Sequence, residues 1–116
     1  MKIAKTATVV LASEDGDARF VFRLPGLNEL QREAQELGKI EDKMERMTKE
    51  LALSFARLES VEGLEDERGA LSVEDVRALT LPINILTAIH AGYVNAYLSL
   101  LKRKEPPQEK KEGLSA

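Results

Sequence analysis

The sequence predicts an α+β fold that is mainly α, with an N-terminal β-hairpin followed by a long helix, a short helix and a long C-terminal helix. Two patterns favour this class: apolar and polar residues alternate near the N-terminus, as in half-buried strands, and apolar residues then recur at helical spacing over most of the remaining chain. A chain of 116 residues has room for one hydrophobic core. We therefore expect a single helical domain over residues 1–104, including the hairpin, and a disordered polar tail over residues 105–116.

The hairpin is predicted from two apolar segments that flank a turn. Residues 5–12 are rich in Thr and Val, and residues 19–24 place Phe20 and Phe22 on one face. Between them, residues 13–17 include a glycine, which can adopt the positive φ that a hairpin loop often requires. Because a lone hairpin is only marginally stable in water, we expect its Phe face to pack against the helices that follow.

A long helix is predicted over residues 29–59. Asn28 is a suitable N-cap, and Gln31, three residues later, completes the pattern of a capping box. Gly38 weakens this helix by about 1 kcal/mol relative to alanine and could divide it into two segments. Apolar residues follow one another along it at a spacing of seven: Leu30, Leu37, Met44, Leu51 and Leu58.

Two more helices are predicted after an extended acidic loop at residues 60–69. Ser72 is a good N-cap for a short helix that ends near Leu79, and Pro82 suits the first turn of the last helix. Residues 78–101 contain no charged side chain, so their length alone would permit a membrane span. Because this segment carries several Thr and Asn side chains that would need partners in hydrocarbon, we predict a buried core helix instead.

Composition and motifs exclude most catalytic chemistry. The chain has no cysteine, which excludes disulfides, thiolate metal sites and cysteine nucleophiles, and its net charge of -3 argues against nucleic-acid binding through a basic face. His90, the one histidine, lies in the uncharged segment without an acid or nucleophile on the adjoining turns, so we interpret it as a hydrogen-bonded core or interface residue. The acidic clusters at 14–17 and 62–67 fit a turn and a solvated loop better than a calcium loop. We expect no enzyme activity, and no catalytic residue, cofactor or metal site.

The heptad stripe, as we call the apolar series between residues 30 and 58, is the strongest physical signal in the sequence. Part of it must bury against the hairpin and the last helix of its own chain. A helix of about 30 residues would be about 45 Å long, which exceeds the radius of a compact domain of this size, so part of the stripe is left for a partner. That partner is either an amphipathic helix of another protein or a second copy of this chain. The residues that we assign to partner binding are Leu37, Ile40, Met44, Met47 and Leu51.

Two segments of the chain resemble phage tail assembly chaperones. Residues 20–25 (FVFRLP), followed by Asn28-Glu29-Leu30, are similar to the opening of those proteins, in which a short strand ends in a proline before an acidic helix start. Residues 71–82 (LSVEDVRALTLP) are similar to the turn that leads into the final helix of the family. The resemblance spans residues 18–100.

This resemblance implies a helper that binds the long, helical tape measure protein in the host cytoplasm, keeps it soluble and recruits tail tube protein subunits around it. The heptad stripe would then cover apolar helices of the client. The alternative is a helical homo-oligomeric structural or adaptor protein, in which the heptad stripe is the self-association seam. In either case we expect the chain to form homo-oligomers, and we expect neither nucleic acid nor a membrane among its partners.

Overall fold

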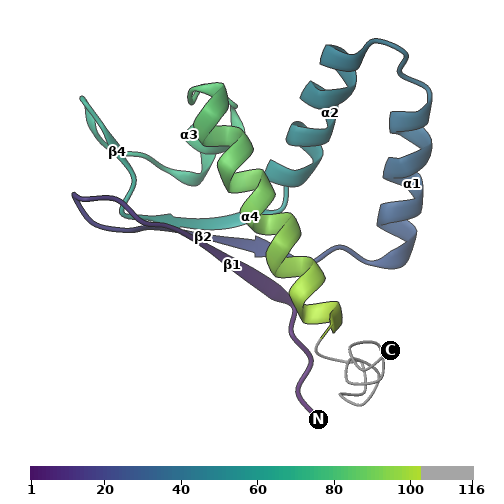
Figure 1. Cartoon of the computed structure of the whole chain (residues 1–116), viewed down its shortest axis with the longest axis horizontal. Coiled ribbons are helices and arrows are strands. Elements are labelled where there is room, and N and C mark those ends of the chain that lie inside the picture. Colours follow the sequence, from purple (N-terminus) through teal and green to yellow (C-terminus); the bar gives the residue numbers. More distant parts are fainter. Residues whose placement is uncertain (103–116) are drawn as a thin grey trace, which may run out of the picture.

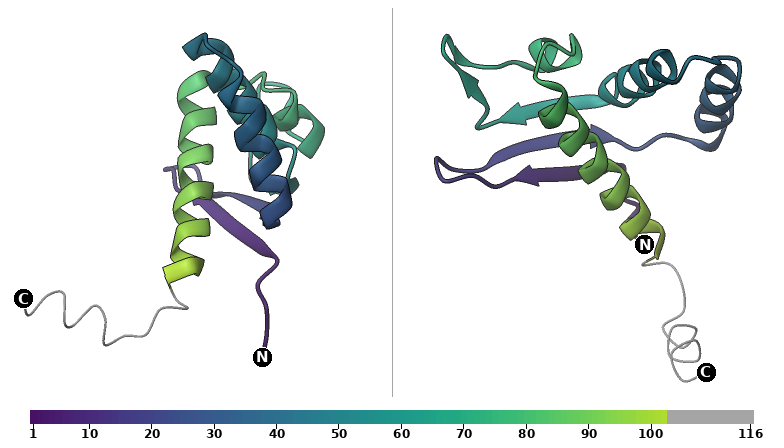
Figure 2. Two further views of the ribbon diagram at one scale, coloured as in Figure 1. Left: turned by 90° about the vertical axis from the view of Figure 1, so that its right-hand side faces the viewer. Right: turned by 45° about the horizontal axis from the view of Figure 1, so that its top comes forward.

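A computed structural model describes residues 1–102 of the protein, which form a three-stranded antiparallel sheet, a separate two-stranded hairpin and four helices. In chain order the elements are β1 (Thr6–Leu11), β2 (Ala18–Arg23), α1 (Leu27–Gly38), α2 (Lys43–Phe55), β3 (Leu58–Glu62), β4 (Glu65–Asp66), β5 (Gly69–Ala70), α3 (Val73–Arg77) and α4 (Ile83–Lys102). The strand order of the larger sheet is β1-β2-β3. α4 crosses this sheet, α2 lies beside α4, and α1 lies on the outer side of α2 (Figures 1 and 2).

The predicted N-terminal hairpin is present as β1 and β2. Its antiparallel register places Val9 opposite Phe20 and continues without a break over all six residues of each strand. Alternate residues of β2 point into the core, where Phe20 and Phe22 have no exposed surface. The period of two in the sequence therefore sets which face of this strand is buried.

The prediction of a mainly helical fold class is wrong, because strands also form in the segment that we expected to be an acidic loop, residues 60–69. β3 pairs with β2 and completes the sheet, and β4 and β5 form a short hairpin. Leu58 and Val61 of β3 contact the core, whereas Glu59 and Glu62 are exposed. A short edge strand needs few apolar residues when the neighbouring strand supplies a complete hydrophobic face. The acidic composition of β3 therefore resembled that of a loop, and the sequence did not indicate a strand there.

The prediction of one helix over residues 29–59 is also wrong, because the chain reverses between α1 and α2 (Figure 1). α1 ends at Gly38, and Asp42 then caps α2 by accepting a hydrogen bond from the backbone N–H of Glu45 at 2.9 Å. α2 in turn ends at Phe55. Each short helix keeps its own apolar face, so the spacing of seven persists across the break, and Gly38, which we expected could divide the helix, marks its position.

Of the two predicted N-cap residues, Ser72 and Asn28, one is confirmed and the other is wrong. Ser72 caps α3 as predicted: its hydroxyl accepts from the N–H of Asp75, and the Asp75 carboxylate accepts from the N–H of Ser72. α1 begins at Leu27, so Gly26 occupies the N-cap position in place of the predicted Asn28.

Aromatic rings from three elements form the centre of the core. The ring of Tyr93 on α4 stacks on Phe22, with the centroids 4.5 Å apart, and the ring of Phe55 on α2 meets Phe22 edge-on at 5.8 Å. Leu86 and Ile89 of α4 are buried beside them. This cluster fixes α2 and α4 on the same face of the sheet.

The close approach of α4 to β1 depends on a glycine. A Cβ atom at Gly92 would lie 2.6 Å from Cγ1 of Val9, which is closer than carbon atoms pack, so a larger residue would push α4 away from the strand. α4 thus belongs to the core, as predicted. Over residues 1–102, no helix is both long and apolar enough to cross a membrane. The predicted tail at residues 105–116 lies outside the described residues.

Candidate functional site

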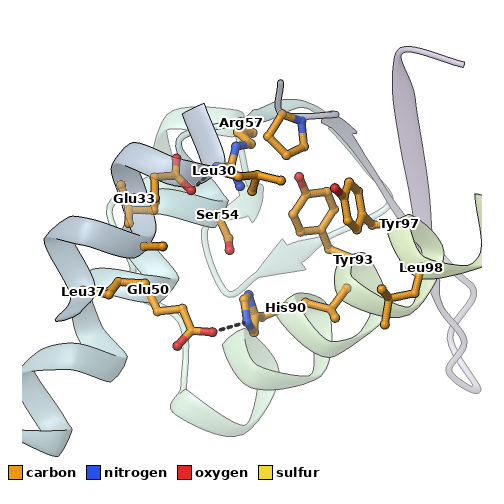
Figure 3. A pocket seen from close by; sticks show the side chains of 14 residues that line it. Leu30, Glu33, Leu37, Glu50, Ser54, Arg57, His90, Tyr93, Tyr97 and Leu98 are labelled. Atoms are coloured by element: carbon orange, nitrogen blue, oxygen red, sulfur yellow. Dashed lines mark hydrogen bonds and ion pairs between the residues drawn. The ribbon is translucent and has the colours of Figure 1, made fainter. Parts of the chain in front are cut away.

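α1, α2 and α4 enclose a groove that is open to solvent, and we call it the helical groove (Figure 3). Its cavity volume is about 340 Å³. α1 and α4 form its two sides, and α2 lies between them. The lining residues are Pro25, Leu30, Glu33, Ala34, Leu37, Glu50, Leu53, Ser54, Arg57, His90, Tyr93, Val94, Tyr97 and Leu98.

Most of the side chains that line the helical groove are apolar, and part of their surface is exposed. On the α1 side, Leu30 and Leu37 are half-buried. On the α4 side, Val94 and Leu98 retain 37% and 45% of their surface. Isolated exposed apolar residues occur on any protein surface and need no explanation. Several of them lining one concavity, in contrast, are typical of a binding site.

α1 is positioned with little help from apolar burial. It contains no buried residue, although Leu30, Ala34 and Leu37 recur at helical spacing and face the groove. The apolar face of α2 is buried in the core. The apolar face of α1 is not, because the groove separates α1 from α4. Another interaction must therefore hold the helix in place.

That interaction is a network of two arginines and two glutamates at one end of the helical groove. The Arg57 side chain is only 5% exposed and pairs with Glu33 and with Glu29, where its Nε lies 3.4 Å from Oε2. Arg23 at the end of β2 donates to both oxygens of Glu29, with Nη2 2.7 Å from Oε2. The carboxylates come from α1 and the guanidinium groups from the sheet side, so the network ties α1 to the core.

The pKa shifts in this network agree with its geometry. The hydrogen bond from Arg23 lowers the pKa of Glu29 to about 2, and the charge of Arg57 adds to the effect. Burial alone would lower the pKa of Arg57, but the hydrogen bond with Glu33 and the nearby charges raise it above its usual value. Burial raises the pKa of the Tyr93 phenol, whose hydroxyl donates to the carbonyl of Arg23 at 3.2 Å.

His90 lies between α4 and α2 in the wall of the helical groove (Figure 3). Its Nε2 is 3.4 Å from Oε1 of Glu50, and its Nδ1 is buried without a hydrogen-bond partner among the described residues. Most of the ring is covered, since the side chain is 19% exposed. The His90–Glu50 pair is thus one of the polar features in a lining that is mostly apolar.

The structure separates the five residues that we assigned to partner binding. Leu37 lines the helical groove, and Ile40 is half-buried in the turn between α1 and α2. Met44 is 66% exposed outside the groove, while Met47 packs against the core. Leu51 is 5% exposed and belongs to the core itself, so it offers no surface to a partner of the folded chain. The break after α1 divides the heptad stripe, and only its first part reaches the groove.

The α4 side of the helical groove is not among the residues that we predicted to bind a partner. We predicted a buried core helix in residues 78–101, because this segment has no charged side chain to mark an exposed side. The i, i+4 pairs of Tyr93 with Tyr97 and of Val94 with Leu98 were the available signal. In the structure all four line the groove, and Tyr93 is the one of them that is buried.

Comparison with known proteins adds no family to this description. No family model, curated protein or solved structure matches the chain. Within residues 1–102, no group of three or more Cys, His, Asp or Glu side chains is placed to hold a metal ion. The helical groove is therefore the feature on which a functional proposal can rest.

Proposed function

We propose that this protein binds an amphipathic helix of a client protein in the helical groove. The observation that carries the proposal is the groove itself, which has apolar side chains on three helices and exposed apolar surface on its α4 side. Apolar residues of a client helix at spacings of three and four would bind in such a groove, where their surface is removed from water. The protein acts as a binding partner in this proposal, and not as an enzyme.

The polar groups around the helical groove indicate the charge of the client. Glu33 and Glu50 lie in the lining, and Glu36 is exposed one turn away on α1. Arg57 is already paired with two carboxylates, so its charge is compensated. A client helix with Lys or Arg beside its apolar face would therefore complement the rim.

The family resemblance supports a specific client. We propose that the protein is a phage tail assembly chaperone whose client is the tape measure protein, and that it keeps this protein soluble in the host cytoplasm and helps to recruit tail tube protein subunits. A long helical client presents many apolar helix faces, and each of them is prone to aggregation until it is covered. A groove that covers one such face suits this task.

The proposal is tested by co-expressing the chain with a phage tape measure protein, the client that the proposal names, and measuring the soluble fraction of the client. Leu37→Ser removes an apolar side chain from the groove lining, and we expect about a tenfold loss of affinity or more, from about 1.5 kcal/mol or more of lost burial. Met44→Ser is the matched control, since Met44 is exposed outside the groove.

Three outcomes decide the proposal. A client that is soluble with the wild-type chain and with Met44→Ser, but not with Leu37→Ser, supports it. A client that is equally soluble without the chain contradicts the proposal. A stable oligomer of the chain whose groove never exchanges its occupant for a client helix would favour the homo-oligomeric structural or adaptor protein instead.

A further inference from the structure

Two segments without any charged side chain meet at one edge of the molecule. Residues 6–13 and 78–101 contain no Asp, Glu, Lys or Arg, although 32% of all residues are charged. The first segment includes β1, and the second includes all of α4 except its last residue, Lys102; α4 packs directly on β1 through Gly92 and Val9 (Figures 1 and 2). This edge lies on the side of α4 away from the helical groove.

β1 is an edge strand whose outer side is unpaired within the described residues. In the order β1-β2-β3 it hydrogen-bonds to β2 alone. Its six residues keep an unbroken register and include no proline. An unpaired strand of this kind presents a row of free N–H and C=O groups that another strand can satisfy.

The other edge of the sheet is protected in ways that β1 is not. β3 has a register shift opposite Val21 and Phe22, where Glu59 is the extra residue of a bulge. Glu59 and Glu62 also place exposed negative charges along this edge. Bulges and edge charges both oppose strand addition, so the sheet is open to another strand at β1 and blocked at β3.

We propose that a second copy of this chain pairs with β1 through its own β1, in antiparallel orientation. The two sheets would then form one continuous sheet of six strands across a twofold axis. This inference uses a surface separate from the helical groove and does not depend on the function proposed for that groove.

Charge complementarity identifies a second copy as the occupant. The exposed Lys2 and Lys5 precede β1, and the exposed Glu14 and Asp15 follow it. An antiparallel pair of β1 strands brings the basic segment before one β1 (Lys2, Lys5) near the acidic turn after the other (Glu14, Asp15), at both ends of the pair. A parallel pair would instead place lysine beside lysine.

The adjacent side of α4 permits the approach of a second copy. Ala88, Asn95 and Ser99 are exposed there, at helical spacing from Gly92, and none of them lines the helical groove. None of these side chains carries a charge that would be buried as the two copies meet. Thr8 and Val10, exposed on the uncovered face of the sheet, would extend across the pair as cross-strand neighbours.

The test is the oligomeric state of the full chain, measured by sedimentation velocity over a range of concentrations. We expect the wild type to dimerise reversibly. Thr8→Lys and Thr8→Glu each place like charges opposite one another at the centre of the pair, and each should raise the dimer dissociation constant by about tenfold or more. An equimolar mixture of the two variants should regain the dimer, because the opposed charges are then of opposite sign.

Glu62→Lys on β3 is the matched control, and it should leave the dissociation constant unchanged. Circular dichroism checks that the variants fold, and hydrogen exchange provides a second measurement on the wild type, in which the protection of β1 amides should rise with protein concentration. A wild type that stays monomeric overturns the proposal. A dimer that both Thr8 variants leave intact also overturns it, as does a dimer that dissociates with Leu37→Ser but not with Thr8→Lys.

Discussion

Glu29 joins two arginines to the first turn of α1. Its carboxylate accepts from Arg23 and lies next to Arg57, and it also approaches the backbone N–H of Gly26 at the start of the helix. One side chain thus links β2, the end of α2 and the first turn of α1. An acid in this turn also interacts favourably with the helix dipole.

The shifted pKa of Glu29 predicts an acid-sensitive contribution to stability. The pKa falls from an ordinary value of 4.5 to about 2 on folding, so between these values the unfolded state binds more protons than the folded state. The stabilisation is therefore complete above about pH 4.5 and is lost as the pH falls toward 2. We expect Glu29→Gln to lower the free energy of unfolding at pH 7 by about 1 kcal/mol, after allowance for solvent screening.

The measurement is urea unfolding of both proteins at a series of pH values. The difference between wild type and Glu29→Gln should shrink steadily as the pH falls from 4.5 to 2. A difference that stays constant over this range would show that Glu29 does not act through its charge.

Gly63 is the residue at which backbone geometry most restricts the choice of side chain. It follows β3 with a φ of 78°, and a Cβ atom there would collide with the backbone oxygen of Asp17. Gly63→Ala should lower the free energy of unfolding by about 2–3 kcal/mol, because the strain and the collision act together.

Gly38→Ala is the matched control, because the position is helical and open, with no atom within 4 Å of the place that a Cβ atom would occupy. It should change stability by less than about 1 kcal/mol, in the stabilising direction. Thermal unfolding of the two variants separates the effects. Equal melting temperatures would contradict the role assigned to Gly63.

At the scale of elements, α1 differs from the other long helices in how it is held. α2 buries Leu51 and Phe55 in the core, and α4 contributes Leu86, Ile89 and Tyr93, whereas α1 buries no residue. Ion pairs at its N-terminal half, rather than a packed face, keep it beside α2. We therefore expect α1 to open locally at a lower free energy than α2 or α4.

Hydrogen exchange of the backbone amides measures this opening. Amides of α1 should exchange faster than those of α2 and α4, and Arg57→Met should accelerate exchange in α1 by about tenfold or more, because Glu29 and Glu33 lose a buried partner. Lys49→Met is the control, since the ammonium of Lys49 lies 3.9 Å from Glu36 with both side chains nearly half exposed. Such a surface pair contributes under about 1 kcal/mol. Uniform acceleration of all helices by Arg57→Met would contradict a local role.

At the scale of the whole molecule, α4 separates the two surfaces to which we assign partners. Val94, Tyr97 and Leu98 line the helical groove on one side, and Gly92 packs on β1 toward the other side. We expect the two interactions to be energetically independent, because the variants that test them lie on different elements, Leu37 on α1 and Thr8 on β1.

Leu37→Ser should therefore weaken client binding without changing the dimer dissociation constant, and Thr8→Lys should do the reverse. In a double variant the two free-energy changes should add within about 0.5 kcal/mol. Titration of the client followed by sedimentation of the same samples measures both quantities. A double variant that departs clearly from additivity would show that dimerisation reshapes the groove.

Local patterns in the sequence were sufficient for several elements. The alternation around Phe20 and Phe22 identified the hairpin and its buried face, and Ser72 identified the start of α3. The uncharged segment after residue 78 identified a core helix. In each case neighbouring residues carry the whole signal, through strand periodicity, a side-chain cap or continuous hydrophobicity.

The rest was decided by contacts between distant residues. β3 is a strand because residues 58–62 lie against β2, which is far earlier in the chain, and their own acidic composition favours a loop. The heptad stripe was compatible with one helix or with two. In the structure the chain reverses after α1, so there are two helices, and the helical groove forms beside them. Local propensity sets which backbone conformations are available, whereas burial against a distant partner selects among them, and the site that joins α1, α2 and α4 exists only after that selection.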